Sequence, residues 1–449
     1  LALDMARQSL VLLQNKGGVL PLKAGGEPIA VIGPNADDGP MMWGNYNGTP
    51  NRTVTILDGI KARYKRVTYL KGCDLTDTKT VNSLLPQCAI DGRKGLRGTF
   101  WNNTGMQGRP VATQFYTAPV AVTTAGMHNF APGVNVEDFS AKYETVYTPK
   151  TSGEVVVNVE GCGDFSLYVN GKEQVKHHTW RTTSTRTPLQ VKAGEEYRIE
   201  VRFAFVKTWG ANLKINIGTE HPIDYQAIIR KVVFVGGISA ALEGEEMPVD
   251  IDGFKGGDRT NIELPKVQRD FLRALHEAGK TVVFVNCSGS AIALEPEMET
   301  CDAILQAWYA GQEGGTAVSD VLFGTVNPSG KLPVTFYKRT DQLPDYEDYS
   351  MRGRTYRYFS DPLFAFGYGL SYTTFRFGRA RAEAAEGGYR LSVPLTNAGT
   401  RPGEEVVQVY IRRVADANGP LKSLRAFRRV ALKAGESTTV EIPLSRKSF

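Results

Sequence analysis

The chain has 449 residues, of which 41% are hydrophobic and 22% charged, a length that suits about two to four domains. Its formal net charge of +6 is small for this size and no block of Lys and Arg stands out, so a nucleic-acid partner is not expected. No apolar run approaches the roughly 18 residues that a membrane-spanning helix needs, so no membrane partner is expected either.

The five cysteines show no CxxC motif and no Cys/His spacing typical of a metal site. We therefore expect neither a metal nor another cofactor. The spacing of Cys73 and Cys88 permits a disulfide between them but does not establish one. Cysteine usage does not decide the cellular compartment of the protein.

The chain begins with an amphipathic pattern that predicts a helix over 6–15. Because it opens at Leu1 and enters this pattern directly, we expect the N-terminal part of a longer protein to precede it. An apolar run at 28–34, a helical pattern at 57–64 and a second apolar run at 67–72 follow. This β-α-β beginning predicts parallel strands with helical crossovers.

The loop after the first apolar run is both polar and aromatic, with Trp43, Asn45 and Tyr46 close together. Aromatic rings beside Asn are typical of a sugar-binding surface. The alternative is an ordinary surface loop that one Trp anchors.

The helical period disappears between 96 and 218, where apolar and polar residues alternate instead. The clearest alternating runs lie at 155–159, 165–170, 197–203 and 213–218. Together with turn signals such as Asn170-Gly171, they predict antiparallel β structure. An all-β block between two α/β stretches is most simply a domain inserted into a surface loop.

An acidic loop follows the next buried strand, which we place at 232–235. Glu243, Glu245 and Glu246 lie in this loop, before the pair Asp258-Arg259 and a helical pattern at 267–278. Ligand chemistry in open α/β sheets takes place at the carboxyl ends of strands, so the position favours a general acid or base. The alternative is a solvated loop whose acids only keep the protein soluble.

The α/β pattern continues with strands at 281–287 and 303–309 and a helix at 314–323. Arg354 lies in a Tyr- and Arg-rich loop, where it either lines a substrate subsite or packs at a domain interface. From 377 the chain returns to β alternation, which suggests a small sandwich.

Several stretches in this order resemble glycoside hydrolase family 3, the family of β-glucosidases and β-xylosidases. They are ARQSLVLLQNKGGVLPL (6–22), AVIGPNAD (30–37), LEGEEM (242–247) with GGDRTNIELP (256–265), WYAGQEGGTAVSDVLFGTVNPSGKLPVTF (308–336), PLFAFGYGLSYTTF (362–375), and GEEVVQVYI with PLKSLRAFRRVAL (403–432). The insert is similar to a PA14 domain at 142–175 and 191–203, and the C-terminal block is similar to a fibronectin type III-like domain.

The resemblance implies a fold class of α/β with two all-β additions. An α/β sandwich domain with a parallel sheet would occupy 1–95 and 219–375. A PA14-like β domain would be inserted at 96–218, and a fibronectin type III-like sandwich would close the chain at 376–449. Family members also carry an N-terminal (β/α)8 barrel, which we expect this chain to lack.

The resemblance also implies which residues act. The nucleophile is an aspartate of the barrel, and the general acid/base is a glutamate in a loop of the sandwich. The family motif places the acid/base on Glu245, with Glu243 and Glu246 as alternatives because the register is open by a residue or two. Asp258 and Arg259 are expected to pair with each other or with the backbone and so hold the loop.

The expected function is that of a retaining exo-β-glycosidase that releases glucose or xylose from β-linked oligosaccharides, and the sequence does not separate glucosides from xylosides. The chain would supply the acid/base and would be inactive without the barrel, its expected partner domain. The alternatives are a non-catalytic carbohydrate-binding protein and one half of a split glycosidase. The resemblance implies a secreted or periplasmic location, and a homodimer is left open.

Overall fold

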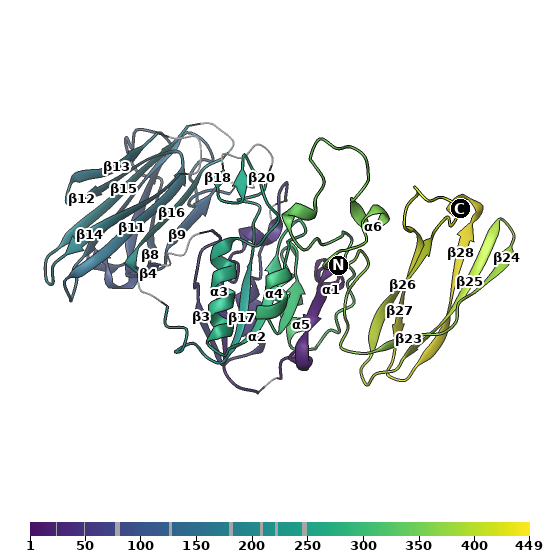
Figure 1. The fold of residues 1–449 in the computed structure, drawn as a ribbon. Helices are drawn as coiled ribbons and strands as arrows, with labels where there is room; N and C mark the ends of the chain where they lie inside the picture. The colour runs from purple at the N-terminus through teal and green to yellow at the C-terminus, as the bar shows by residue number, and fades with distance from the viewer. Residues whose placement is uncertain are drawn as a thin grey trace. The chain divides into compact units, whose positions relative to one another are not determined.

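The computed structural model describes residues 1–23, 25–48, 50–76, 81–124, 128–178, 183–206, 210–220, 223–244 and 249–449. The chain divides into two compact units, which are treated separately below (Figure 1). The first unit comprises Leu1–Tyr46, Pro50–Thr78 and Asp224–Phe449, and the second comprises Asn47–Thr49 and Lys79–Ile223.

A mostly parallel sheet forms the centre of the first unit. Its strands are β1 (Val11–Asn15), β2 (Ile29–Ile32), β3 (Val67–Leu70), β17 (Lys231–Gly237), β21 (Thr281–Cys287) and β22 (Ala303–Gln306). They lie in the order β1-β22-β21-β17-β2-β3, and all neighbours are parallel except β1, which runs antiparallel to β22. The central strands read as continuous apolar runs because the sheet is buried on both faces.

Helices cover both faces of this sheet. They are α1 (Ala2–Ser9), α2 (Ile56–Arg63), α3 (Lys266–Glu277), α4 (Glu295–Thr300) and α5 (Gly314–Leu322). The helices α1, α2 and α5 share a buried core with alternate sheet residues such as Val233 and Val283. The other face packs on α3, where the rings of Phe271 and Phe234 lie 5.6 Å apart, and α4 is joined to α3 by the ion pair between Arg269 and Glu297.

The expected helix over 6–15 is wrong in its second half. The helix α1 ends at Ser9, Leu10 is extended with ψ 131°, and Val11–Asn15 form the strand β1. The reason is burial on all sides, because Val11, Leu12 and Leu13 are each at most 1% exposed. Consecutive buried side chains suit a strand that is covered on both faces better than an amphipathic helix with one exposed side.

The second unit consists of antiparallel β structure. Its strands are β4 (Val81–Ser83), β5 (Ala89–Ile90), β6 (Arg93–Lys94), β7 (Leu96–Trp101), β8 (Ala112–Tyr116), β9 (Val120–Thr123), β10 (Phe139–Tyr147), β11 (Gly153–Cys162), β12 (Asp164–Val169), β13 (Lys172–His177), β14 (Thr183–Val191), β15 (Tyr197–Phe205) and β16 (Asn212–Glu220). One sheet has the order β13-β12-β15-β10-β5-β6, with β7 on β10 and β8 on β7. The other has the order β14-β11-β16-β4, with β9 on β16.

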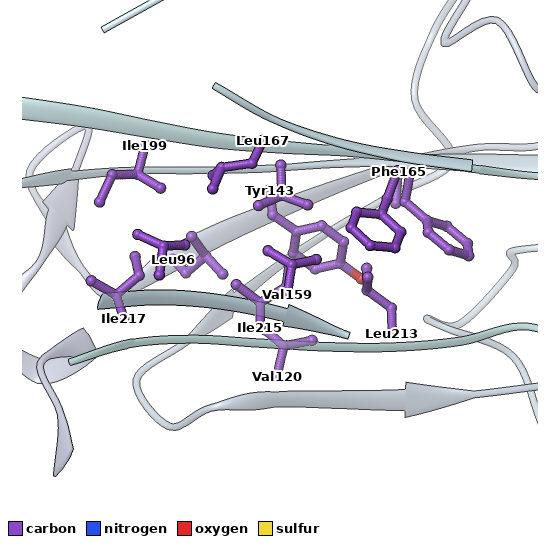
Figure 2. Close-up of a cluster of buried hydrophobic side chains, with 14 of the residues drawn as sticks. Leu96, Val120, Tyr143, Val159, Phe165, Leu167, Ile199, Leu213, Ile215 and Ile217 are labelled. Atoms are coloured by element: carbon purple, nitrogen blue, oxygen red, sulfur yellow. The ribbon is translucent and has the colours of Figure 1, made fainter. Parts of the chain in front are cut away.

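The four alternating runs of the sequence are the strands β11, β12, β15 and β16, as expected. Figure 2 shows the core of the unit, where side chains from both sheets meet around Tyr143. Leu167 and Ile199 come from one sheet and Leu213 and Ile215 from the other.

The chain ends in a C-terminal sandwich that belongs to the first unit. Its strands are β23 (Phe375–Phe377), β24 (Arg381–Ala385), β25 (Gly388–Asn397), β26 (Gly403–Ile411), β27 (Ser423–Leu432) and β28 (Ser437–Ser445). One sheet is built around β25, which pairs with the strands β23, β24 and β28, while β26 pairs with β27. An ion pair of 2.8 Å between Lys331 and Glu405 links the sandwich to the α/β part.

Shorter helical elements complete the described structure. They are η1 (Lys16–Gly18), η2 (Pro40–Trp43), η3 (Leu85–Gln87), η5 (Thr340–Gln342), α6 (Thr355–Tyr358) and η6 (Arg446–Ser448). All five cysteines are buried and free, so the disulfide that the sequence left open between Cys73 and Cys88 is not formed. Across the described residues, no helix has the length and apolar character that a membrane crossing requires.

A buried carboxylate ties three helices together on one face of the parallel sheet. Asp320 of α5 is 0% exposed and accepts a hydrogen bond of 2.8 Å from Nε of Arg7 in α1. Arg63 of α2 donates to the other carboxylate oxygen. Two cations therefore compensate the burial of one charge.

We expect Asp320→Asn to lower the free energy of unfolding of the first unit by about 2 kcal/mol, because hydrogen bonds to a charged group are lost at a buried position. Urea unfolding measures the change. Asp4→Asn is the matched control, because Asp4 pairs with the same Arg7 but is 66% exposed. Equal losses of unfolding free energy in the two variants would contradict the stabilising role assigned to the buried Asp320.

The second unit also contains a buried carboxylate, Glu144 of β10, whose side chain is 1% exposed. Burial raises the pKa of Glu144, but hydrogen bonds from Arg97, Arg198 and Lys142 outweigh it and lower the pKa to about 2. A carboxyl whose pKa is depressed on folding stabilises the fold above its unfolded pKa. This stability is lost as the pH falls from about 4.5 towards 2.

We therefore expect Glu144→Gln to flatten the acid dependence of the stability of the second unit. The difference in free energy of unfolding between the parent and this variant should change by on the order of 3 kcal/mol between pH 5 and pH 2. Thermal unfolding across this pH range measures it. Glu160→Gln, which removes a more exposed ion pair with Lys214, should leave the pH dependence close to that of the parent.

Candidate functional site

The candidate site lies at the edge of the parallel sheet where β2, β17, β21 and β22 end, here called the carboxyl edge. From β2 the chain moves outward to β3, then returns to the other side of β2 and continues through β17, β21 and β22. The loops after β2 and β17 therefore leave neighbouring strands at a topological switch point. This is the place where open α/β sheets bind ligands.

Two glycines allow the loops to leave the carboxyl edge so close together. A Cβ on Gly33, whose φ is +125°, would lie 2.1 Å from the carbonyl oxygen of Val235. A Cβ on Gly237, whose φ is +119°, would lie 2.0 Å from the carbonyl oxygen of Cys287. Neither position accepts another residue without a shift of the backbone.

The acidic loop after β17 is fixed at Glu243. Oε1 of its carboxylate accepts hydrogen bonds from the hydroxyl of Tyr309, at 2.8 Å, and from the backbone N–H of Gly289, at 3.1 Å. Oε2 accepts a third bond of 3.0 Å from Oγ of Ser290. The donors follow β21 and β22, so the carboxylate connects three loops of the carboxyl edge.

Arg259 supports the same arrangement from behind the acidic loop. It lies in β20 (Asp258–Arg259), which forms a small antiparallel sheet with β18 (Asp250–Ile251) and β19 (Phe254–Lys255). Its Nη1 donates to Oγ of Ser290 at 3.1 Å and to the carbonyl of Ala291 at 2.9 Å. Burial lowers the pKa of Arg259, while the charge of Glu243 acts in the opposite direction.

Asp258 forms no ion pair with Arg259 within the described part of the chain, and its side chain is exposed. Arg259 instead contacts the backbone and Ser290. Glu245 and Glu246, the expected acid/base and one of its alternatives, lie outside the described residues. The other alternative, Glu243, is the carboxylate described above.

Of the residues expected to bind substrate, Asn45 is bonded to the acidic loop, and Tyr46 is the residue that follows Asn45 in the chain. Nδ2 of Asn45 donates to the backbone carbonyl of Glu243 at 2.8 Å. Tyr46 follows it with a side chain that is 86% exposed and a φ of +52°, which a bulky residue rarely adopts. The loop after β2 is therefore bonded to the loop after β17.

The other two expected binding residues have partners inside the protein. Nε1 of Trp43 donates to Oγ1 of Thr53 at 2.7 Å, and its half-buried ring packs against the sheet core. Arg354 donates to the carbonyls of Asp345 and Asp348, at 2.7 and 2.8 Å, and so holds its own loop. These bonds are typical of residues that shape a loop.

Tyr309 and Ser290 were not expected from the sequence, although a signal was present. Each stands three residues after a buried parallel strand, in the motifs WYAGQ and NCSGS. The rule that places ligand chemistry at the carboxyl ends of strands applies to these loops as well as to the acidic one.

Comparisons with known proteins agree with this architecture. Residues 10–372 match the family model of the glycosyl hydrolase family 3 C-terminal domain, and residues 405–449 match that of the fibronectin type III-like domain. The chain is 63% identical to a protein of Xylanibacter ruminicola named xylan 1,4-beta-xylosidase, over 100% of this chain and 53% of that protein. It is 42% identical to a periplasmic beta-glucosidase of Salmonella typhimurium, over 99% of this chain and 44% of that protein.

A solved structure with the same fold is that of a beta-glucosidase from Kluyveromyces marxianus in complex with glucose. It aligns with a TM-score of 0.73 at 26% identity and covers 100% of this chain and 57% of that one. The chain thus spans about half the length of the curated relatives that it matches.

We expect Glu243→Gln to loosen the carboxyl edge. The variant keeps the size of the side chain but replaces an accepting oxygen with an N–H₂ group that faces a donor, which costs about 1–3 kcal/mol. Hydrogen exchange at the amide of Gly289 should rise accordingly. Glu299→Gln, at an exposed position, is the control, and unchanged protection in both variants would contradict the assigned contacts.

Proposed function

Since the chain belongs to glycosyl hydrolase family 3, as its motifs predicted, we propose that it supplies the general acid/base of a retaining exo-β-glycosidase. The observation that carries the proposal is the acidic loop at the switch point of the parallel sheet, bonded through Glu243 to the loops after β21 and β22. The relative named a xylosidase, at 63% identity, favours β-xylosides as substrates, and the 42% identical beta-glucosidase makes β-glucosides the second candidate.

The chemistry requires two carboxyl groups about 5–5.5 Å apart. One attacks the anomeric carbon as a carboxylate, and the other donates a proton to the leaving oxygen and then removes one from the incoming water. We propose that the attacking aspartate belongs to an N-terminal barrel of the same polypeptide. The chain's coverage of about half of its relatives supports this division.

We propose Glu245 as the proton donor. Both carboxylate oxygens of Glu243 already accept hydrogen bonds within the protein, which favours an anchoring role for this residue. Glu245 follows it by two residues and matches the family motif, with Glu246 as the alternative. Arg259 would hold the loop through its bonds to Ser290 and the backbone.

We also propose that Tyr46 contacts the sugar and that Asn45 orders the loop which carries it. The support is the exposed tyrosine ring next to a residue that is bonded to the acidic loop. Trp43 and Arg354 would contribute through the conformation of their loops, since their polar groups have partners in the protein.

The second unit is proposed to be the PA14-like module expected at 96–218, and its two antiparallel sheets support this assignment. A periplasmic or secreted location is proposed from the resemblance and from the Salmonella relative, which is named periplasmic. The barrel is the proposed partner domain and a β-linked oligosaccharide the proposed ligand. A homodimer stays a prediction.

The test uses the full-length polypeptide and two substrates that differ only in leaving group, phenyl β-xyloside and dinitrophenyl β-xyloside. We expect Glu245→Gln to reduce kcat/KM by about 10²- to 10⁴-fold for the phenyl xyloside, whose leaving oxygen needs a proton. The dinitrophenyl xyloside should lose far less, because its leaving group departs without protonation. Added azide should restore turnover and yield β-xylosyl azide, since azide needs no general base.

Glu246→Gln is the matched control, one residue away with the same chemical change. If it gives the azide product and Glu245→Gln does not, Glu246 is the acid/base. If substitution of Glu243, Glu245 and Glu246 in turn never produces dependence on the leaving group, the proposed function is contradicted.

A further inference from the structure

We propose that Tyr309 is a positioning residue, which sets the place of the acid/base by holding Glu243. This inference rests on the proposed function, because it deepens the account of the same site. The hydroxyl of Tyr309 lies 2.8 Å from Oε1 of Glu243, and the two residues stand in loops behind different strands, β22 and β17.

The backbone at Trp308, the residue before Tyr309, is strained, and this conformation fixes the direction of the chain at Tyr309. Trp308 has a φ of +57°, a conformation that is rare for a bulky residue and persists only where its surroundings enforce it. Those surroundings are present, because Nε1 of Trp308 donates to the carbonyl of Ser9 at 3.0 Å and its ring packs against Phe336. Strained backbone of this kind clusters at functional sites.

The ring of Tyr309 fills a slot that two glycines leave open. A Cβ on Gly289 would lie 2.9 Å from Cε2 of the ring and 3.0 Å from Oε1 of Glu243. A Cβ on Gly44 would lie 3.3 Å from Cδ2. The ring therefore contacts the loops after β2 and β21, while its hydroxyl contacts the loop after β17.

The charges around the hydroxyl keep it a donor. Burial, the charge of Glu243 and the hydrogen bond to Glu243 raise the pKa of Tyr309 well above its ordinary value. The other titratable groups that act on this pair are Arg259 and, more weakly, Cys287. The hydroxyl thus stays protonated and its bond to Glu243 persists at neutral pH.

Glu243 precedes the proposed donor Glu245 by two residues in the chain, so we infer that loss of its anchor disturbs proton donation by Glu245. Displacement of a catalytic group by about 1 Å can reduce the rate about 10²-fold. The bond from Tyr309 should therefore affect proton donation and leave sugar binding nearly unchanged.

In the full-length polypeptide, we expect Tyr309→Phe to lower kcat/KM for phenyl β-xyloside between about tenfold and 100-fold. The loss of kcat/KM on dinitrophenyl β-xyloside should be several times smaller, because its leaving group departs without protonation. Azide should yield no xylosyl azide, because Glu245 is still present. Tyr372→Phe is the matched control, since it also removes a buried tyrosine hydroxyl, one that donates to the carbonyl of Val321 at 2.9 Å.

Hydrogen exchange provides a second readout, which does not depend on enzymatic activity. Hydrogen exchange in peptides over 239–244 and 286–291 should rise in Tyr309→Phe and not in Tyr372→Phe. Gly289→Ala provides a second variant, because its methyl group would push Tyr309 and Glu243 apart, and it should increase exchange in the same peptides.

The inference is overturned if Tyr309→Phe lowers kcat/KM on both xylosides equally, or if neither variant changes exchange at 239–244. These outcomes are distinct from failure of the proposed function. If the proposed function itself were wrong, Glu245→Gln and Glu246→Gln would also lack any dependence on the leaving group.

Discussion

The carboxylate of Glu243 is the point at which three loops of the carboxyl edge meet. Its three hydrogen bonds come from a tyrosine hydroxyl, a serine hydroxyl and a backbone amide, all behind strands other than its own. Bonds to an ionised acceptor are stronger than neutral ones, so the start of the acidic loop cannot move without losing several of them together. A proton donor two residues later in the chain, as proposed for Glu245, would depend on this anchor.

The rest of the first unit supplies rigidity to this arrangement. The sheet is covered on both faces, with the Asp320 cluster joining α1, α2 and α5 on one side and α3 packed on the other. The strand order places β17 beside β2, so the loops that carry Glu243 and Asn45 leave the sheet as neighbours. Close packing of the glycines at the strand ends leaves the loops little freedom to separate.

Much of this fold could be predicted from the sequence, because buried parallel strands and alternating antiparallel strands leave different patterns. The strand before the acidic loop and the one at Thr281–Cys287 lie where their apolar runs indicate. The pattern of VLLQN continues the amphipathic run and so predicts a helix, whereas the strand β1 depends on its pairing with β22, far along the chain. Contacts such as that between Tyr309 and Glu243, 66 residues apart, depend on the strand order, which local patterns do not contain. The role of Glu245 is a proposal from the family motif, because this residue lies outside the described residues.

The most direct test of the central claim is a crystal structure of the full-length polypeptide with a xylose-shaped inhibitor that carries a basic nitrogen in place of the glycosidic oxygen. The account predicts a carboxyl oxygen of Glu245 within about 2.6–3.2 Å of that nitrogen, with Glu243 still bonded to Tyr309. A structure in which another residue contacts the nitrogen while Glu245 points into solvent would contradict it.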